Sequence, residues 1–395
     1  MSMQILTEAR KWDYAKTKLT EGLTGNRKVV LEAVLENQRK WLVESATSGS
    51  TTAGNIAIMN KVMLPVIRRV MPTVIANEII GVQPMSGPVG QIHSLRVQYT
   101  DNVPSNFTGT ISGEEALSPF KVASYYSGNE NVTTPAGRAT ADLEGRMGNK
   151  LNIRILKETV EAKSRRLSAQ WTIESMQDAQ SIHGIDIEAE IMAALAQEMT
   201  VEIDQEIIGS LYTLAGTNSI VTFDQSQVSG VATSVVDEHA ALAVLINQQA
   251  NRIAQRTRRG PGNWAIVSPT VLTLLQSAGA SAFARTTEGS FEAPTNTKFV
   301  GTLNSALRVY SNTYASETAD ILIGYKGTTE ADAAAFYCPY IPLMSSGAVM
   351  DPNTGEMVTT FLSRYGYLEL SNAANSLGNA ADYLARIQVS SLKFY

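Results

Sequence analysis

The sequence has a single cysteine, Cys338, among its 395 residues. One thiol excludes a disulfide bond within the chain and is typical of proteins that fold in a reducing compartment. No apolar run approaches the ~20 residues that a membrane-spanning helix needs. The first residues, MSMQILTEARKWDYAK, lack the apolar segment of a signal peptide. We therefore expect a chain that is made and folds in a cytoplasm.

The sequence also lacks the common signatures of catalysis and nucleotide binding. The patterns GxxxxGK[ST], GxSxG and GxGxxG do not occur. Three scattered histidines, His93, His183 and His239, and one cysteine cannot supply the usual Cys/His ligands of a zinc site. Cys338 lies in AFYCPY among apolar residues, which favours a buried, unreactive thiol over a nucleophile. We expect no enzyme activity, no metal and no cofactor.

Charge is scarce. Charged residues make up 17% of the chain, below the usual quarter, and the net charge is -5. A dedicated nucleic-acid-binding protein would instead carry a net basic domain or face. Low charge combined with many small polar residues suits a protein whose surface is partly covered by partners, although an ordinary enzyme can have the same composition.

Hydrophobic periodicity predicts several helices. The clearest covers 187–211, where an apolar residue recurs every fourth position, glutamates fill the other side and Asp186 can cap the start. A second long helix is predicted from Val236 to Arg256. We also expect an amphipathic helical arm over 1–44 and a helix interrupted by prolines over 56–81.

Strand patterns alternate with these helices. Between Asp101 and about Gly148 the periodicity disappears, which favours a long projecting loop or hairpin over a compact segment. Leu151, Ile153 and Ile155 share one face of the strand that returns from it. NWAIVSPTVLTLLQ (263–276) has the pattern of a strand, a turn and a helix. Further strands are predicted within 90–100, 298–312, 319–327, 333–344, 361–370 and 383–395.

Three charged groups each allow a functional and a structural interpretation. The basic run at Arg256–Gly262 could bind phosphate, but a helix end combined with a subunit contact is favoured. The acids at 186, 188 and 190 could bind a divalent metal, but a charged first helical turn is more common. Arg68 and Arg69 could bind nucleic-acid phosphates, but they face about 100° apart on a helix, so ion pairs are simpler.

The stretch LPVIRRVMPTVIANEIIGVQPMSGPVGQI (64–92) closely resembles the signature of the major head (capsid) proteins of contractile-tailed bacteriophages. Further blocks resemble the same family in the same order, and LENQRKWLVE (35–44) in the arm has a counterpart as well. These blocks are VEAKSRRLSAQWTIESMQDAQSIHGIDIEAEI (160–191), RIAQRTRRGPGNWAIVSP (252–269), GYKGTTEADAAAFYCPYIPL (324–343) and FLSRYGY (361–367).

The resemblance implies an α+β protein with the Hong Kong-type tailed-phage major capsid fold, which bacterial encapsulins and herpesvirus shells share. Its parts map onto the chain as an N-terminal arm and joint (1–55), the first part of the peripheral domain (56–100), an extended loop (101–172), the peripheral domain with its spine helix (173–229), the axial domain (230–345) and C-terminal strands that return to both domains (346–395). The extended loop is too short for the full inserted domain that some relatives carry.

The resemblance also implies a function. The chain would be a structural protein that self-assembles into hexameric capsomers of an icosahedral or prolate head, in the host bacterial cytoplasm, around the double-stranded DNA of a phage. Its partners would be other copies of itself, vertex or pentamer-forming subunits, and the portal, scaffold and decoration proteins. The DNA would be enclosed without specific recognition, and no membrane or small-molecule substrate is expected.

Two sets of residues follow from this interpretation. Contacts between segments or subunits are suspected at Arg68, Arg69, Arg256, Arg258 and Arg259. Leu42-Val43-Glu44 fits the L/I-x-E pattern after which relatives are cleaved during maturation. Because this chain retains its arm, we expect a shell that is not cleaved after Glu44, or one captured before processing.

Other functions remain open at this stage. A pentameric vertex protein of the same fold differs mainly by its usual extra length, which is absent here. An encapsulin-like shell protein would share the fold and the compartment but not the phage-type blocks. A hydrolase or another enzyme would need a nucleophile, a base or metal ligands, and the sequence shows no such set.

Overall fold

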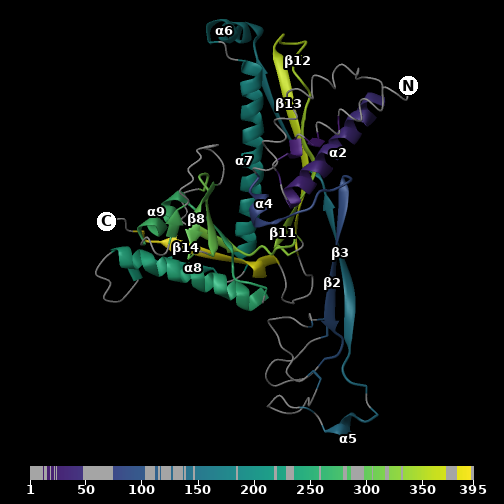
Figure 1. Ribbon diagram of the computed structural model, residues 1–395, viewed down its shortest axis with the longest axis vertical. Coiled ribbons are helices and arrows are strands. Elements are labelled where there is room, and N and C mark those ends of the chain that lie inside the picture. The colour runs from purple at the N-terminus through teal and green to yellow at the C-terminus, as the bar shows by residue number, and fades with distance from the viewer. Residues whose placement is uncertain are drawn as a thin grey trace. The chain divides into compact units, whose positions relative to one another are not determined.

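The structure of the chain is a computed structural model. It describes residues 12, 16–17, 19–21, 23, 25–47, 74–102, 112–113, 116, 126–127, 137, 139–145, 147–183, 186–217, 220–227, 235–257, 259–278, 283–285, 298–304, 306–315, 320–330, 332–370 and 380–392. Helices and sheets are both present, so the chain is α+β, as the sequence predicts (Figure 1).

The chain divides into two compact units, each built from segments that are distant in sequence. Unit 1 combines Met1–Gly90, Val160–Ile208 and Phe336–Leu368. Unit 2 combines Gln91–Thr159, Gly209–Ala335 and Glu369–Tyr395.

The sheet of unit 1 has five strands. These are β1 (Gly81–Val82), β4 (Lys163–Trp171), β11 (Ala335–Ser345), β12 (Val349–Met350) and β13 (Met357–Glu369). β1 runs parallel to β11, and β13 pairs antiparallel with β4 along the whole length of β4. On β13 buried and half-buried residues alternate, as expected of a strand with one face in the core.

Unit 1 also contains the helices α2 (Asn26–Thr47), α4 (Ala76–Ile79), α6 (Ile173–His183) and most of α7 (Ile187–Ala215). α2 buries an apolar stripe made of Val30, Leu31, Val34 and Leu35. Two asparagines also hold it: Asn26 Nδ2 donates to the Val82 carbonyl at 3.3 Å, and Asn37 Nδ2 to that of Met85 at 2.7 Å.

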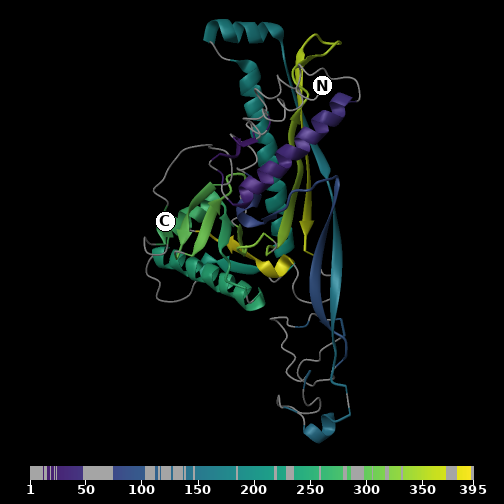
Figure 2. The same cartoon turned by 45° about the vertical axis from the view of Figure 1, so that its right-hand side comes forward.

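Unit 2 contains most of a two-stranded ribbon formed by β2 (Val89–Tyr99) and β3 (Leu151–Glu161). Figure 2 shows the two strands side by side as a long twisted hairpin. A short helix, α5 (Thr140–Leu143), lies in the segment that connects them. The return strand predicted from the spacing of Leu151, Ile153 and Ile155 is therefore confirmed.

The larger sheet of unit 2 has seven strands in the order β5-β14-β10-β6-β9-β8-β7. Their bounds are β5 Val221–Asp224, β14 Leu384–Ser390, β10 Asp320–Gly324, β6 Trp264–Val267, β9 Leu307–Ser311, β8 Lys298–Leu303 and β7 Phe283–Arg285. Two 3-10 turns, η2 (Gln225–Gln227) and η3 (Ala380–Tyr383), flank these strands in the sequence. β10 pairs antiparallel with both neighbours, whereas β6 runs parallel to β9. The sheet is therefore mixed.

Two helices pack on this sheet through one hydrophobic core. They are α8 (Val235–Thr257), which lies alongside the strands in Figure 1, and α9 (Pro269–Ser277). Ser268 caps α9 by accepting a hydrogen bond from the Val271 amide, and Pro269 occupies the first turn, where its missing N–H is tolerated. The core is made largely of aliphatic side chains, including Ile246, Ile253, Val267, Leu274, Ile321, Ile323 and Ile387.

The last turn of α7 is fixed to this sheet within unit 2. Arg386 of β14 forms an ion pair with Asp320 of β10, with 2.6 Å between Nη2 and Oδ2. The same guanidinium lies over the ring of Tyr212 in α7, 5.8 Å from its centroid. One arginine thereby joins two strands and a helix end.

Most predicted elements are confirmed, with differences at their ends. α7 and α8 match the predictions for 187–211 and 236–256, and the predicted strands are present. The helix in the arm ends at Thr47 rather than at 44, because no glycine or proline occurs between Asn26 and Gly49. In the described part of the helix predicted for 56–81, only Ala76–Ile79 is helical, and Gly81–Val82 is a strand because β11 pairs with it.

The domain boundaries remain a proposal. β4 lies inside the range proposed for the extended loop, yet it pairs fully with β13 of unit 1. This pairing favours ending the proposed loop near residue 161.

Candidate functional site

The described residues contain no group of three or more His, Cys, Asp or Glu side chains placed to hold a metal ion. Cys338 is buried in β11, and burial raises the pKa of its thiol to about 11, so the thiolate is scarce at neutral pH. None of the described helices is long and apolar enough to cross a membrane.

The acids at the start of α7 have a structural role. Asp186 Oδ1 accepts hydrogen bonds from the Glu188 amide at 3.1 Å and from the Ala189 amide at 3.5 Å. Glu188 and Glu190 lie in the first turn, where their charge is favourable near the positive end of the helix dipole. The capping role predicted for Asp186 is confirmed.

The basic run after α8 is partly neutralised. Arg256 is half-buried in the last helical turn, and Arg259 Nη1 forms an ion pair with Asp332 Oδ1 at 2.5 Å. Tyr325 packs closely against Gly260, and its hydroxyl donates to the Arg259 carbonyl at 3.4 Å. Since Asp332 already neutralises Arg259, this geometry disfavours a phosphate site there. Whether these arginines also contact another subunit remains a proposal.

Other predicted residues have less structural context. Arg68, Arg69 and Arg258 lie outside the described residues. Glu44 belongs to helix α2, so the bond after it lies inside a helix and not at the start of the predicted joint.

An ion-pair cluster in unit 1 was not predicted from the sequence. The guanidinium of Arg165 on β4 donates to Glu202 at 2.7 Å, to Glu206 at 2.5 Å and to the Tyr365 hydroxyl at 2.6 Å. Tyr365 also donates to Glu206. Burial pushes the pKa of Glu206 upward, but the hydrogen bonds from Tyr365 and Arg165 outweigh it, so this pKa lies below its ordinary value.

The sequence contained one signal for this cluster. Glu202 and Glu206 are four residues apart on a predicted helix and therefore share a face. The pattern assigned them to the polar side of α7, but it could not identify Arg165 as their partner, because β4 is far away in the sequence.

Among the described residues, a prominent exposed apolar surface lies on β3. Leu151, Ile153 and Ile155 expose 51%, 63% and 66% of their areas, and alternate residues of a strand share one face. We call these three residues the β3 stripe. Val349 and Met350 of β12 are exposed as well, at 56% and 53%, but as consecutive strand residues they point to opposite faces. A contiguous exposed apolar row such as the β3 stripe marks a surface that binds other proteins.

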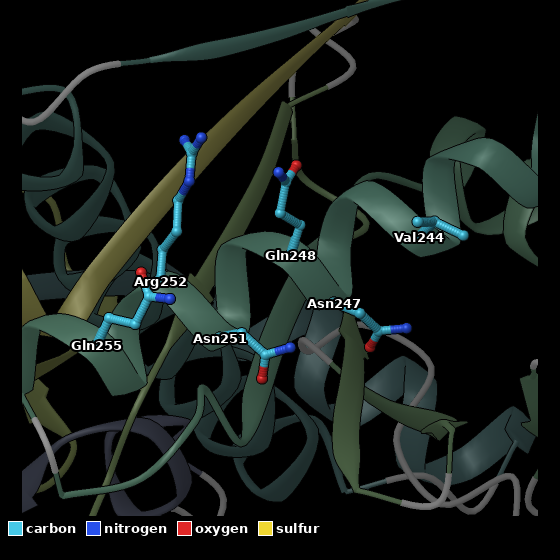
Figure 3. A pocket seen from close by; sticks show the side chains of 6 residues that line it. All are labelled: Val244, Asn247, Gln248, Asn251, Arg252 and Gln255. Atoms are coloured by element: carbon cyan, nitrogen blue, oxygen red, sulfur yellow. The ribbon is translucent and has the colours of Figure 1, made fainter.

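A polar depression of about 430 Å³ lies on α8, lined by Val244, Asn247, Gln248, Asn251, Arg252 and Gln255. Figure 3 shows these side chains in two rows along the helix. Val244, Gln248 and Arg252 form one row, and Asn247, Asn251 and Gln255 form the other. We call the space between them the α8 groove. The opposite face of the helix packs into the core of unit 2.

Comparisons with known proteins agree with the resemblance found in the sequence. A family model described as "Major capsid protein Gp23" matches residues 56–389. The major capsid protein of Vibrio phage KVP40 is 29% identical over 440 residues, which cover 90% of this chain and 85% of the relative. That of Salmonella phage ViI is 31% identical over 349 residues, with 78% of each chain covered.

Among solved structures, a chain from "The capsid of Myoviridae Phage XM1" aligns with a TM-score of 0.45 and 12% sequence identity. The alignment covers 79% of this chain and 90% of that chain.

Proposed function

This chain belongs to the Gp23 major capsid protein family, and on that basis we propose that it builds the phage head shell through hexameric capsomers. Its function is structural: it is a subunit of the virion capsid shell. Six-fold capsomers need head-to-tail contacts between identical subunits, in which two different surfaces of the chain meet. The proposal therefore requires exposed surfaces that are better suited to a neighbouring subunit than to water.

The β3 stripe is the observation that supports this proposal best. Three large aliphatic side chains exposed in a row are unfavourable in water, and covering each one stabilises the contact by up to about 1.5–3 kcal/mol. We propose that the β2–β3 hairpin lies across a neighbouring copy in the same capsomer and covers this stripe. Both strands are 11 residues long, so the hairpin offers an extended contact surface.

Other contacts are proposed between segments of the chain or between subunits. Val349 and Met350 at β12 are candidates, as are the arginines at 68, 69, 256, 258 and 259. Each contact can be modest, because every subunit is held by several at once and their effects multiply. The total surface area that each subunit buries in these contacts should exceed the ~1,600 Å² of a standard protein–protein interface.

We further propose that the shell encloses double-stranded DNA without binding it tightly or specifically. The net charge of -5 supports this, since a surface that binds DNA tightly is basic. Vertex subunits, portal, scaffold and decoration proteins are the further partners proposed, and assembly is proposed to take place in the host bacterial cytoplasm. No step of catalysis is proposed for the chain.

Substituting the middle of the β3 stripe tests the hairpin contact. Ile153→Asp places a charge in the proposed interface, and we expect electron micrographs of cells expressing the variant to show few or no closed particles. Because the side chain is 63% exposed, the subunit itself should fold, and far-ultraviolet circular dichroism should match the unsubstituted chain.

Asn152→Asp is the matched control. Asn152 is exposed on the opposite face of the same strand. The substitution therefore adds the same charge next to Ile153 but outside the β3 stripe. Particles should form with this variant. If Ile153→Asp assembles as well as Asn152→Asp does, the hairpin contact is wrong.

A further inference from the structure

The α8 groove has the geometry of one half of a helix contact. Its two rows, Val244-Gln248-Arg252 and Asn247-Asn251-Gln255, each follow a spacing of four residues (Figure 3). Side chains at this spacing form the ridges of a helix surface, and a ridge of a second helix packs into the groove between two such ridges. The depression of about 430 Å³ is lined by these two rows of one helix.

The composition of the groove is unusual for a surface that faces water. Surface helices commonly carry lysine and glutamate, whereas this groove holds amides, one exposed valine and a single charge, that of Arg252. Amides both donate and accept hydrogen bonds, so a partner's backbone or polar side chains can satisfy them when water leaves. Removing a charge from water costs much more than removing an amide. The groove is thus suited to being covered.

The charge at its edge indicates the kind of partner. Gln248, Gln249, Gln255 and Arg256 occupy the positions three and four residues away from Arg252, so none of them is an acid. Within the described part of the chain, neither Arg252 nor Arg256 forms an ion pair. The chain as a whole has 37 acidic and 32 basic side chains. A second copy of the chain therefore carries acidic side chains that can form an ion pair with Arg252.

We propose that the α8 groove is the docking site for a ridge of helical side chains from a second copy of this chain, with an acidic residue of that copy beside Arg252. This inference rests on the proposed function, because it assigns one side of a contact between identical subunits. Val244, at 68% exposed, is the apolar anchor at one end, and the amides along both rows bind the polar edges of the incoming helix.

Two other occupants fit less well. Small-molecule pockets are enclosed and lined mainly by apolar and aromatic groups, and this groove has no aromatic side chain. DNA would favour a denser set of lysines and arginines than Arg252 with Arg256 alone, and the chain is acidic overall. A helical ridge from a second subunit fits between the two rows, can form hydrogen bonds with the amides and can bring an acidic side chain to Arg252.

Photo-crosslinking tests this assignment. Gln248 lies in the middle of one row, and its side chain is exposed, so p-benzoylphenylalanine can replace it in the full chain without disturbing the core. Particles are purified, irradiated and analysed by mass spectrometry. We expect an adduct between two copies of this chain, mapped to a helical segment of the second copy. Placing the probe at Asn251 repeats the experiment if the first variant does not assemble.

The other outcomes overturn the inference. They are an adduct with a different protein, an adduct with DNA, or formed particles with no adduct at the groove. Electron micrographs of the same preparation report separately on the proposed function. Particles with hexameric capsomers but no adduct between copies would reject the α8 contact alone, whereas an absence of hexamers in the unsubstituted chain would reject the proposed function.

Discussion

Single residues show how burial changes the chemistry that the sequence indicates. Asp204 belongs to the acid-rich helix α7, yet only 1% of it is exposed. Its Oδ1 accepts a hydrogen bond from the Ile75 amide at 2.9 Å, and its Oδ2 has no partner among the described residues. Burial raises the pKa of this carboxyl from 3.8 to about 7, although the Ile75 amide acts in the opposite direction.

This carboxyl makes the stability of the subunit depend on pH. The folded chain keeps the proton up to about pH 7, whereas the unfolded chain releases it near pH 3.8, so the free energy of unfolding falls as the pH rises between these values. The difference corresponds to on the order of 4 kcal/mol. Asp204→Asn removes the charge and keeps an oxygen for the Ile75 amide. We expect its stability relative to the unsubstituted chain to improve from pH 4 to pH 7.

Guanidinium unfolding of the unassembled chain at several pH values, followed by tryptophan fluorescence, measures this effect. The quantity of interest is the difference between D204N and the unsubstituted chain at each pH, because other titrating groups then cancel. A difference that stays constant from pH 4 to pH 7 would show that Asp204 ionises normally in the folded state.

At the scale of elements, Arg165 joins three segments of unit 1. It lies on β4 and contacts Glu202 and Glu206 of α7 and Tyr365 of β13. Because β4 pairs with β13, the cluster fixes the helix over two adjacent strands. Both glutamates are more than a third exposed, so solvent screens part of the attraction.

Removing this arginine should weaken the packing of α7 on the sheet. For Arg165→Met we expect a loss of about 1–2 kcal/mol in the free energy of unfolding, since several charge-assisted hydrogen bonds disappear while the aliphatic volume remains. Denaturant unfolding measures it, and the loss should shrink in 1 M salt.

Arg166→Met is the control for this change. Arg166 is the next residue of β4, points to the opposite face and is exposed. It should change stability by no more than about 0.5 kcal/mol. Equal losses for the two variants would mean that the cluster around Arg165 contributes nothing specific.

The elements themselves could largely be predicted from local patterns. The spacing of apolar residues in α7 and α8, and the alternation in β2 and β13, are visible in short windows of sequence. α4 and β1 were harder to predict. Gly81-Val82 is too short to show a period, and it becomes a strand because Phe336 and Tyr337 pair with it from a distant part of the chain. Such pairing depends on tertiary contacts.

At the scale of the whole molecule, the N-terminal arm raises a question about maturation. The bond after Glu44 lies inside α2, which ends at Thr47. Proteases cut flexible, exposed segments most readily, and a hydrogen-bonded helix must first unfold locally. We predict that mature virions keep the arm, so N-terminal sequencing of the shell protein should not find Ser45 as the first residue, and peptides from the arm should be recovered from the particles.

A variant tests whether the helix protects the bond after Glu44. Thr47→Pro clashes with the carbonyl of Val43 and unwinds the last turn of α2, so any processing after Glu44 should be faster in this variant. Finding Ser45 as the first residue of the unsubstituted shell protein would show that the helix does not protect the bond.

The sequence by itself determined the family, the long helices and strands, and the absence of recognisable catalytic motifs, because motif residues and hydrophobic periods are local properties of the chain. It also showed that Leu151, Ile153 and Ile155 share a face. Only the tertiary structure decided that this face is uncovered within the chain, that Arg165 meets Glu202 and Glu206, and that Asp204 is buried. Burial and ion pairing depend on which distant segments pack together, and one residue's local sequence does not contain that information.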